Sequence, residues 1–256
     1  MIAYFSGTGN SHLVARMLRK LTGDDIVSIP DLIKKGTTTL TSNRPFVIVS
    51  PIYAWKIPNY VEDFIKRTEF KGTDMIYFIM TCGGEAGFNC KYVENLCKKK
   101  GLDFMGEVDL TMPDNYLIMD DPPKEDVARK MIKAIVPNVR EAADHISKGE
   151  IIRSSPHGGM LRTYVVNPLF YKFNIDCDGF SVSSSCDGCG KCVSDCPTGC
   201  ISMDKGKPIW SGNCIQCLSC INRCPTSAIE FKSKTKGKNR YVCPITDPDE
   251  LLQSRS

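Results

Sequence analysis

The chain has 256 residues, of which 42% are hydrophobic and 24% are charged, a composition typical of globular proteins and unlike that of disordered ones. Its formal net charge of +4 is too small to indicate nucleic-acid binding by itself. The apolar runs are too short to cross a bilayer, and no basic segment precedes the first of them, so we expect a cytoplasmic protein without a signal peptide or a membrane anchor.

Residues 1–150 alternate between short apolar segments and helical patterns. The expected strands lie at 2–5, 26–29, 46–50, 75–81 and 104–110, and the expected helices at 11–21, 59–68, 89–100 and 123–148. Pro137 is expected to kink the last helix. Strands that alternate with helices indicate an α/β domain with a doubly wound parallel sheet, covered by helices on both faces.

The loop after the first expected strand reads Ser6-Gly7-Thr8-Gly9-Asn10-Ser11, and a helix follows it. Hydroxyls and backbone N–H groups at a helix N-terminus can bind a phosphate, whose charge the helix dipole favours. The loop is not a P-loop, because no G-K-[ST] follows, and His12 stands where a dinucleotide fingerprint needs its last glycine. Taken alone, the loop can also be a glycine turn with an N-cap.

Two further loops follow expected strands. The first contains Pro51, Tyr53, Ala54 and Trp55, and one of its aromatic rings could lie against a flat ligand. The second contains Thr81, Cys82, Gly83, Gly84 and Gly87, and its glycines let the backbone approach a ligand closely. Ligands of open parallel sheets bind outside the carboxyl ends of the strands, so three such loops predict a ligand site at that edge.

Residues 151–176 are expected to be a connector that packs on the rest, because they contain four aromatic residues, Tyr164, Phe170, Tyr171 and Phe173. Residues 177–256 contain eleven of the 14 cysteines and too few apolar residues for an ordinary core. A secreted disulfide scaffold would be short and would carry an export signal. Ligation of a metal or a cluster is therefore favoured for this second domain.

The cysteines of the second domain form an internal repeat. Two runs with the spacing C-x2-C-x2-C-x3-C, each followed by proline, lie 28 residues apart. In bacterial two-cluster ferredoxins, which have this spacing, the fourth cysteine of each run ligates the other cluster. The predicted ligand sets for two 4Fe-4S clusters are therefore Cys186, Cys189, Cys192 and Cys224 for the first, and Cys214, Cys217, Cys220 and Cys196 for the second.

A pair of zinc sites is the alternative interpretation, since paired C-x2-C motifs occur in zinc ribbons. A zinc site, however, has no use for the third cysteine and the duplicated C-x3-C-P. Six cysteines lack ligand spacing and are expected to be core residues, except Cys82 in the candidate ligand loop. They are Cys82, Cys90, Cys97, Cys177, Cys200 and Cys243.

With these motifs the chain resembles the flavodoxin–ferredoxin fusion proteins of anaerobic bacteria and archaea. The resemblance covers the S-G-T-G-N-S start, the P-x-Y-x-W-x-x-P loop at 51–58, the T-C-G-G loop and the cluster pair. It implies a flavodoxin-like sheet of order 2-1-3-4-5 followed by a small α+β ferredoxin domain. It also implies two 4Fe-4S clusters and one FMN, with the FMN phosphate at 6–11 and its ring between the loops 51–58 and 81–87.

The resemblance implies electron transfer between the clusters and FMN, linking one-electron and two-electron redox partner proteins. An FMN-dependent reductase is the alternative, with a small organic substrate near Tyr53, Trp55, Glu85 and Tyr116. His12, His145 and His157 stand apart in the sequence, so we expect no catalytic acid–base pair.

Two features depart from the usual flavodoxin pattern. Flavodoxins are commonly acidic, whereas this chain is slightly basic, and Pro113-Asp-Asn-Tyr116 either closes over the flavin or forms a turn. Five basic residues alternate near the C-terminus, where a solvated tail is favoured over an acidic-partner or nucleic-acid site. They are Lys232, Lys234, Lys236, Lys238 and Arg240.

Overall fold

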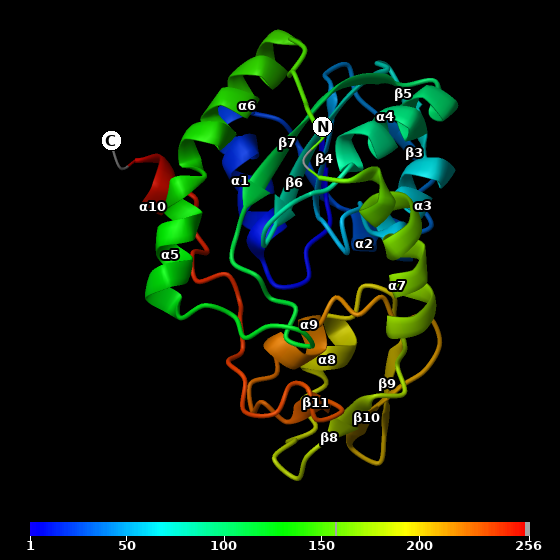
Figure 1. Cartoon of the computed structure of the whole chain (residues 1–256), viewed down its shortest axis with the longest axis vertical. Coiled ribbons are helices and arrows are strands. Elements are labelled where there is room, and N and C mark those ends of the chain that lie inside the picture. Colours follow the sequence, from blue (N-terminus) through cyan, green and yellow to red (C-terminus); the bar gives the residue numbers. More distant parts are fainter. Residues whose placement is uncertain (157, 254–256) are drawn as a thin grey trace.

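The protein is described here by a computed structural model that covers residues 1–156 and 158–253. Its central sheet has five parallel strands in the order β2-β1-β4-β6-β7, which confirms the predicted flavodoxin-like topology (Figure 1). The strands are β1 (Ile2–Tyr4), β2 (Ile26–Ser28), β4 (Phe46–Pro51), β6 (Met75–Cys82) and β7 (Asp103–Thr111). Strands β4 and β6 are almost wholly buried, as expected for a sheet that helices cover on both faces.

Each face of the sheet has its own apolar core. On one face, Val14 and Val139 pack with Ile79 of β6. On the other face, Val61 packs with Phe78 of the same strand. The first face is covered by α1 (Asn10–Thr22), α5 (Glu125–Ala134) and α6 (Val136–Lys148), and the second by α2 (Ile29–Lys34), α3 (Asn59–Arg67) and α4 (Asn89–Lys100), as Figure 1 shows.

The predicted kinked helix over 123–148 is wrong in one respect, because two helices, α5 and α6, occupy this segment. Pro137 lies in the first turn of α6, where its missing N–H would have no partner anyway. The structure also contains a parallel pair of three-residue strands, β3 (Thr39–Thr41) and β5 (Glu69–Lys71), which are too short to show a periodicity in the sequence.

Residues 150–156 run along the edge of the sheet, and residues 158–174 lie over its carboxyl end. The backbone N–H of Ile152 donates to the carbonyl of Met105 in β7 (2.8 Å). Gly106, with φ +126°, leaves no room for a side chain, because a Cβ there would overlap Ile152. A π-helical turn, η1 (Arg162–Val166), and α7 (Asn167–Asn174) follow.

The second domain consists of two related halves. The antiparallel pairs are β8 (Phe180–Val182) with β11 (Ile229–Phe231) and β9 (Ile201–Asp204) with β10 (Lys207–Trp210). Two short helices, α8 (Lys191–Ser194) and α9 (Ser219–Asn222), lie 28 residues apart, as the cysteine runs do. Cysteines contribute to its small core together with Leu218 and Ile221.

The end of the chain returns to the first domain (Figure 1). Ile245 and Leu251 are buried in the core beneath α1 and α6, and α10 (Asp249–Leu252) lies beside α5. Asp249 accepts a hydrogen bond from Lys20 of α1 (2.6 Å). The C-terminal segment (residues 241–253) is therefore packed against the first domain. It follows the five alternating basic residues at 232–240, for which the sequence favoured a solvated tail and of which Lys232, Lys234 and Lys236 are exposed. Within the described residues, no helix combines the length and apolarity that crossing a membrane requires.

Replacing Ile245 by alanine should destabilise the protein by about 2–5 kcal/mol, because the deletion leaves a cavity in the core. In thermal unfolding of the anaerobic, cofactor-loaded protein, the midpoint should fall by about 5 °C or more. The control is Ile209→Ala in β10, whose side chain is 47% exposed and should change the midpoint by about 2 °C or less. Equal shifts in the two variants would contradict the docked position of the C-terminal segment.

Candidate functional site

The eight cysteines of the repeat surround two separate hollows, grouped as the crossed rule predicts. The first hollow is lined by Cys186, Cys189, Cys192 and Cys224. The second is lined by Cys196, Cys214, Cys217 and Cys220, together with Cys200. No group of three or more His, Cys, Asp or Glu side chains in the described part of the chain is placed to hold a single metal ion.

Residues with a left-handed backbone conformation shape the loops around both hollows. In the first loop Gly188 (φ +75°) and Gly190 (φ +71°) adopt this conformation, which costs glycine little. Their counterparts 28 residues later are Gln216 (φ +46°) and Leu218 (φ +55°), which carry side chains and bear strain. The backbone path is thus the same in both halves, although glycine is present in only one.

Backbone N–H groups point at two of the cysteine sulfurs. The N–H of Gln216 donates to Cys214 Sγ and that of Ala228 to Cys224 Sγ, both at 3.3 Å. Such bonds stabilise negative charge on sulfur and are one of the means by which proteins adjust cluster potentials. Four thiols around a cavity, with donors aimed at their sulfurs, fit an iron–sulfur cluster.

The two hollows differ in exposure. Cys189 of the first hollow is exposed, whereas Cys196 and Cys220 of the second are buried. Cys200 was expected to be a core residue; it is buried, and its sulfur lies 3.6 Å from Cys196 Sγ. The second hollow therefore lies deeper in the protein and has a fifth thiol in its wall.

The three predicted ligand loops meet at the carboxyl edge of the sheet, after β1, β4 and β6. The hydroxyls of Ser11 and Thr81 are hydrogen bonded (2.8 Å), which joins the first loop to the third. The segment after β7 is bonded to the first loop. The Asn10 amide donates to the Pro113 carbonyl (3.0 Å), and the Asn115 amide donates to Thr8 Oγ1 (2.6 Å).

The phosphate loop (residues 6–11) presents free donors. In the described part of the chain, the backbone N–H groups of Gly7, Thr8, Asn10 and Ser11 have no acceptor within hydrogen-bond distance, although Thr8 and Ser11 are almost wholly buried. Only the Gly9 N–H is bonded, to Ser6 Oγ (3.1 Å). Buried N–H groups without acceptors are rare in proteins, and a cluster of them at a helix N-terminus fits a phosphate.

The loop 51–58 is a tight turn held by the connector. Ala54 and Trp55 have φ of +47° and +64°, an unusual conformation for residues with side chains. The Asn167 amide donates to the carbonyls of Tyr53 and Ala54 (both 2.9 Å), and the Thr163 hydroxyl donates to that of Trp55 (2.8 Å). Helix α7 and η1 thus fix a strained turn at the predicted ring site.

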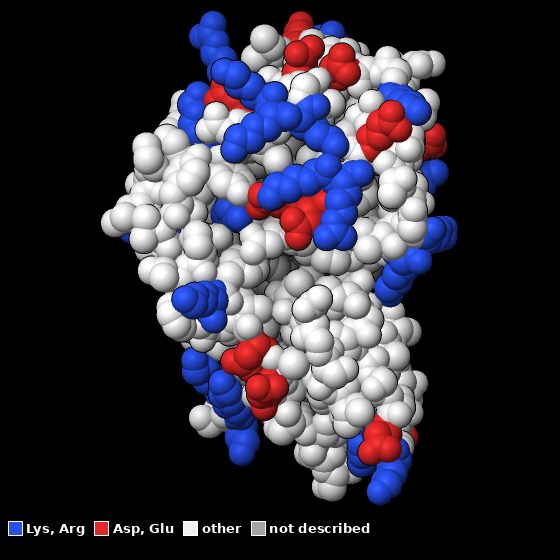
Figure 2. All heavy atoms as spheres, turned by 90° about the vertical axis from the view of Figure 1, so that its right-hand side faces the viewer, with Lys and Arg blue, Asp and Glu red and all other residues white. Residues whose placement is uncertain are grey.

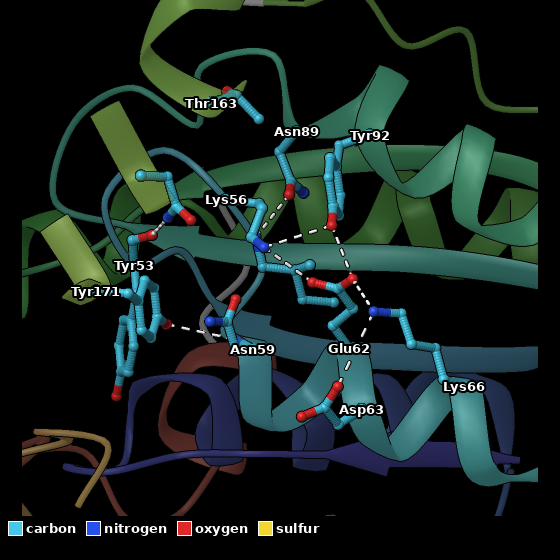
Figure 3. Close-up of polar contacts among 12 residues, drawn as sticks. Tyr53, Lys56, Asn59, Glu62, Asp63, Lys66, Asn89, Tyr92, Thr163 and Tyr171 are labelled. Carbon is cyan, nitrogen blue, oxygen red and sulfur yellow. Dashed lines mark hydrogen bonds and ion pairs between the residues drawn. The ribbon is translucent and has the colours of Figure 1, made fainter. Parts of the chain in front are cut away.

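A buried ion pair joins the loop 51–58 to helix α3 (Figure 3). Lys56 Nζ lies 2.9 Å from Glu62 Oε2, and the Tyr92 hydroxyl donates to the other carboxylate oxygen (2.7 Å). Lys66 makes a second ion pair with Glu62, from a largely exposed position. Burial alone would raise the pKa of the Glu62 carboxyl, but the hydrogen bonds from Lys56, Lys66 and Tyr92 outweigh it and hold the pKa below its ordinary value.

The third loop contains a closely packed glycine and an inert thiol. A Cβ on Gly87 (φ +71°) would lie 2.7 Å from Trp55 Cβ, so glycine is needed for the loops to touch. Burial, aided by Asp109, raises the pKa of Cys82 to about 12, so its thiol is protonated and unreactive at neutral pH. Gly83 and Gly84 are exposed and leave the loop open to an approaching ligand.

The second domain lies directly against these loops. A Cβ on Gly7 would stand 2.7 Å from the carbonyl oxygen of Cys217. The Tyr60 hydroxyl donates to the Pro197 carbonyl (3.1 Å), and the Tyr116 hydroxyl donates to the Gln216 side chain (2.9 Å). The wall of the second hollow therefore touches the predicted flavin site.

Sequence reasoning missed the residues that make this contact from the far end of the chain. The Nε of Arg223 donates to the Gly7 carbonyl (3.0 Å), and the Tyr241 hydroxyl donates to the Asn10 side chain (2.6 Å). No spacing motif joins residues more than 200 positions apart, so the sequence carries no local signal for them. Tyr53 and Tyr116 face the second domain, whereas Glu85 pairs with Arg162 at the surface. His157 lies outside the described residues.

Comparisons with known proteins identify both parts. Residues 1–114 match a family described as a flavodoxin domain, and residues 185–229 match one described as a 4Fe-4S dicluster domain. An uncharacterised protein of Methanocaldococcus jannaschii is 27% identical over 100 residues, which cover 36% of this chain and 45% of that protein. The chain thus spans less than half of that relative.

The solved structures that resemble part of this chain include a flavodoxin and a protein described as a putative flavoprotein. Megasphaera elsdenii flavodoxin in its two-electron reduced form is 17% identical, with a TM-score of 0.35, over 56% of this chain and 97% of that one. A putative flavoprotein from Bacteroides eggerthii is 18% identical, with a TM-score of 0.33, over 54% of this chain and 95% of that one.

Replacing Lys56 by methionine should destabilise the protein strongly, because it leaves the buried Glu62 carboxylate without its buried partner, a loss of about 3–5 kcal/mol. The thermal midpoint should fall by about 6 °C or more. The matched control is Lys66→Met, which removes the exposed partner of the same carboxylate and should cost about 1 kcal/mol or less. If Lys66→Met lowered the thermal midpoint as much as Lys56→Met does, the contribution of each ion pair to stability would not depend on how deeply the lysine is buried.

Proposed function

Because the chain is a fusion of a flavodoxin domain with a 4Fe-4S dicluster domain, we propose that this electron-transfer protein passes electrons between two 4Fe-4S clusters and one FMN. It would thereby link one-electron and two-electron redox partners. When bound, the clusters supply single-electron steps, and the flavin supplies steps of one or two electrons. The protein's own contribution is to hold the groups close together and to adjust their potentials.

One observation carries this proposal: the wall of the second hollow touches the loops of the predicted flavin site. Cys217 lies beside Gly7 of the phosphate loop and packs in the same apolar cluster as Tyr53 of the second loop. A cluster at this place and a flavin at the sheet edge would be separated by little more than these side chains. Electrons would then need no mobile carrier between the two domains.

The difference in exposure suggests an order for the transfer. Cys189 of the first hollow is exposed, so a partner protein can approach a cluster there. The second hollow is deeper and adjoins the flavin loops. We therefore assign the first cluster as the contact with one-electron protein partners and the second as the link to the flavin.

The phosphate loop favours FMN over an unphosphorylated flavin. The unbonded N–H groups of Gly7, Thr8, Asn10 and Ser11 would bind the phosphate, and the dipole of α1 would stabilise its charge. Trp55 and the backbone at Gly83 and Gly84 would lie next to the ring.

A basic surface on the first domain lies away from this site (Figure 2). It contains basic side chains at the C-terminal ends of α3 and α4. Lys66, Arg67, Lys98 and Lys99 are exposed, and Lys100 is half-buried. These ends lie at the amino edge of the parallel sheet, opposite the phosphate loop. We therefore assign electron entry to the cluster end of the molecule and not to this surface.

Cofactor analysis tests the proposal first. Anaerobically purified protein should contain about eight iron, about eight acid-labile sulfides and about one FMN per chain. Full iron and sulfide without flavin, after incubation with excess FMN, would contradict the proposal.

The choice of electron acceptors separates the carrier from a reductase. Reduced protein should be reoxidised by one-electron redox proteins whether or not FMN is bound, whereas transfer to two-electron acceptors should require FMN. The control is flavin-depleted protein with unchanged iron content. Saturable reoxidation by one small organic compound, with no transfer to any protein acceptor, would favour the reductase instead.

A further inference from the structure

The outer side of the phosphate loop is held by donors from the far end of the chain. Arg223, which follows α9, donates from Nε to the carbonyl of Gly7 (3.0 Å). The backbone N–H of Cys243 donates to the carbonyl of Thr8 (2.9 Å). Both contacts occupy acceptors of the loop and leave four of its N–H donors, those of Gly7, Thr8, Asn10 and Ser11, without an acceptor among the described residues.

The bond from Arg223 has a stereochemical consequence. A trans peptide is planar, with its C=O and its N–H on opposite sides. A donor that fixes the Gly7 carbonyl outward therefore points the N–H of Thr8 inward, toward the other side of the loop. That N–H has no acceptor among the described residues, and it is one of the donors expected to bind the phosphate.

Arg223 also adds positive charge at this end of α1. Burial lowers the pKa of His12, and the charges of Arg16 and Arg223 lower it further, so the Arg223 guanidinium acts on the first turn of α1 while His12 is neutral at pH 7. A positive potential here favours an anion at the helix N-terminus. The same side chain thus orients a donor and supplies a charge.

We propose that Arg223 is a positioning residue for the flavin phosphate, so that the dicluster domain completes the phosphate site of the flavodoxin domain. This inference rests on the proposed function, in which the phosphate loop binds FMN. It predicts that the docked position of the clusters and the affinity for phosphorylated flavin depend on each other.

The test compares FMN with riboflavin, which lacks the phosphate. Flavin-depleted full-length protein with its clusters intact is titrated with each flavin, and quenching of flavin fluorescence gives the two dissociation constants. Arg223→Gln should raise the Kd for FMN by about 10- to 100-fold, the range expected for one charge-assisted hydrogen bond. The Kd for riboflavin should change by about twofold or less.

Two further variants separate positioning from structural damage. Arg223→Lys keeps a charged donor and should restore the FMN Kd to within about fivefold of the wild-type value. Arg67→Gln removes an equal charge at the remote end of α3 and should leave both constants unchanged. Iron content, measured on every sample, should stay at the wild-type value.

Three results would overturn the inference while leaving the proposed function intact. They are an unchanged FMN Kd in Arg223→Gln, an equal loss for FMN and riboflavin, and a lysine variant as weak as the glutamine one. If the wild-type protein binds neither flavin, the proposed function fails, and the inference fails with it.

Discussion

The contact between the second hollow and the phosphate loop determines how the two domains can work together. A Cβ on Gly7 would stand only 2.7 Å from the carbonyl oxygen of Cys217, so the two backbone segments approach each other too closely for any residue but glycine. Tyr60 and Tyr116 add hydrogen bonds across the same contact. The C-terminal segment then returns to the first domain and buries Ile245 and Leu251 there. The domains are thus joined on both sides of the predicted flavin site.

Four of the seven described non-glycine residues with positive φ lie in the loops around this contact. Gln216 and Leu218 adopt left-handed conformations that glycines occupy in the first cluster loop, and Ala54 and Trp55 do so in the second flavin loop. Each costs about 1–2 kcal/mol relative to an ordinary conformation. Gln216 uses its side chain to accept a hydrogen bond from Tyr116 and to donate one to Asp176. At Gln216, therefore, a strained backbone conformation coincides with a side chain that bridges the domains.

Much of the fold could be predicted from the sequence, because local patterns encode it. The five apolar segments lie in the sheet in the predicted order, and the cysteine spacing groups the thiols around two hollows as the crossed rule requires. The boundary between helices α5 and α6 could not be predicted, because a proline at position 137 is compatible both with a kink in one helix and with the first turn of a second helix. The assignment of these residues as cofactor ligands remains a prediction.

The contacts between the domains could not be predicted in the same way. Arg223 and Gly7 are 216 residues apart, and nothing near either residue indicates the other. Lys238 and Arg240 look like part of a basic tail, yet they donate to the Leu117 carbonyl and to Glu230. Their partners become apparent only when the chain has folded back on itself.

The rate of electron transfer from the clusters to the flavin tests the central claim most directly. Rapid anaerobic mixing with a one-electron donor, followed at flavin and cluster wavelengths, should show cluster reduction first and then flavin reduction. If the second hollow and the flavin adjoin within one molecule, the rate of the second step should not depend on protein concentration. A rate that rises in proportion to protein concentration, or clusters that stay reduced beside oxidised flavin, would contradict the account.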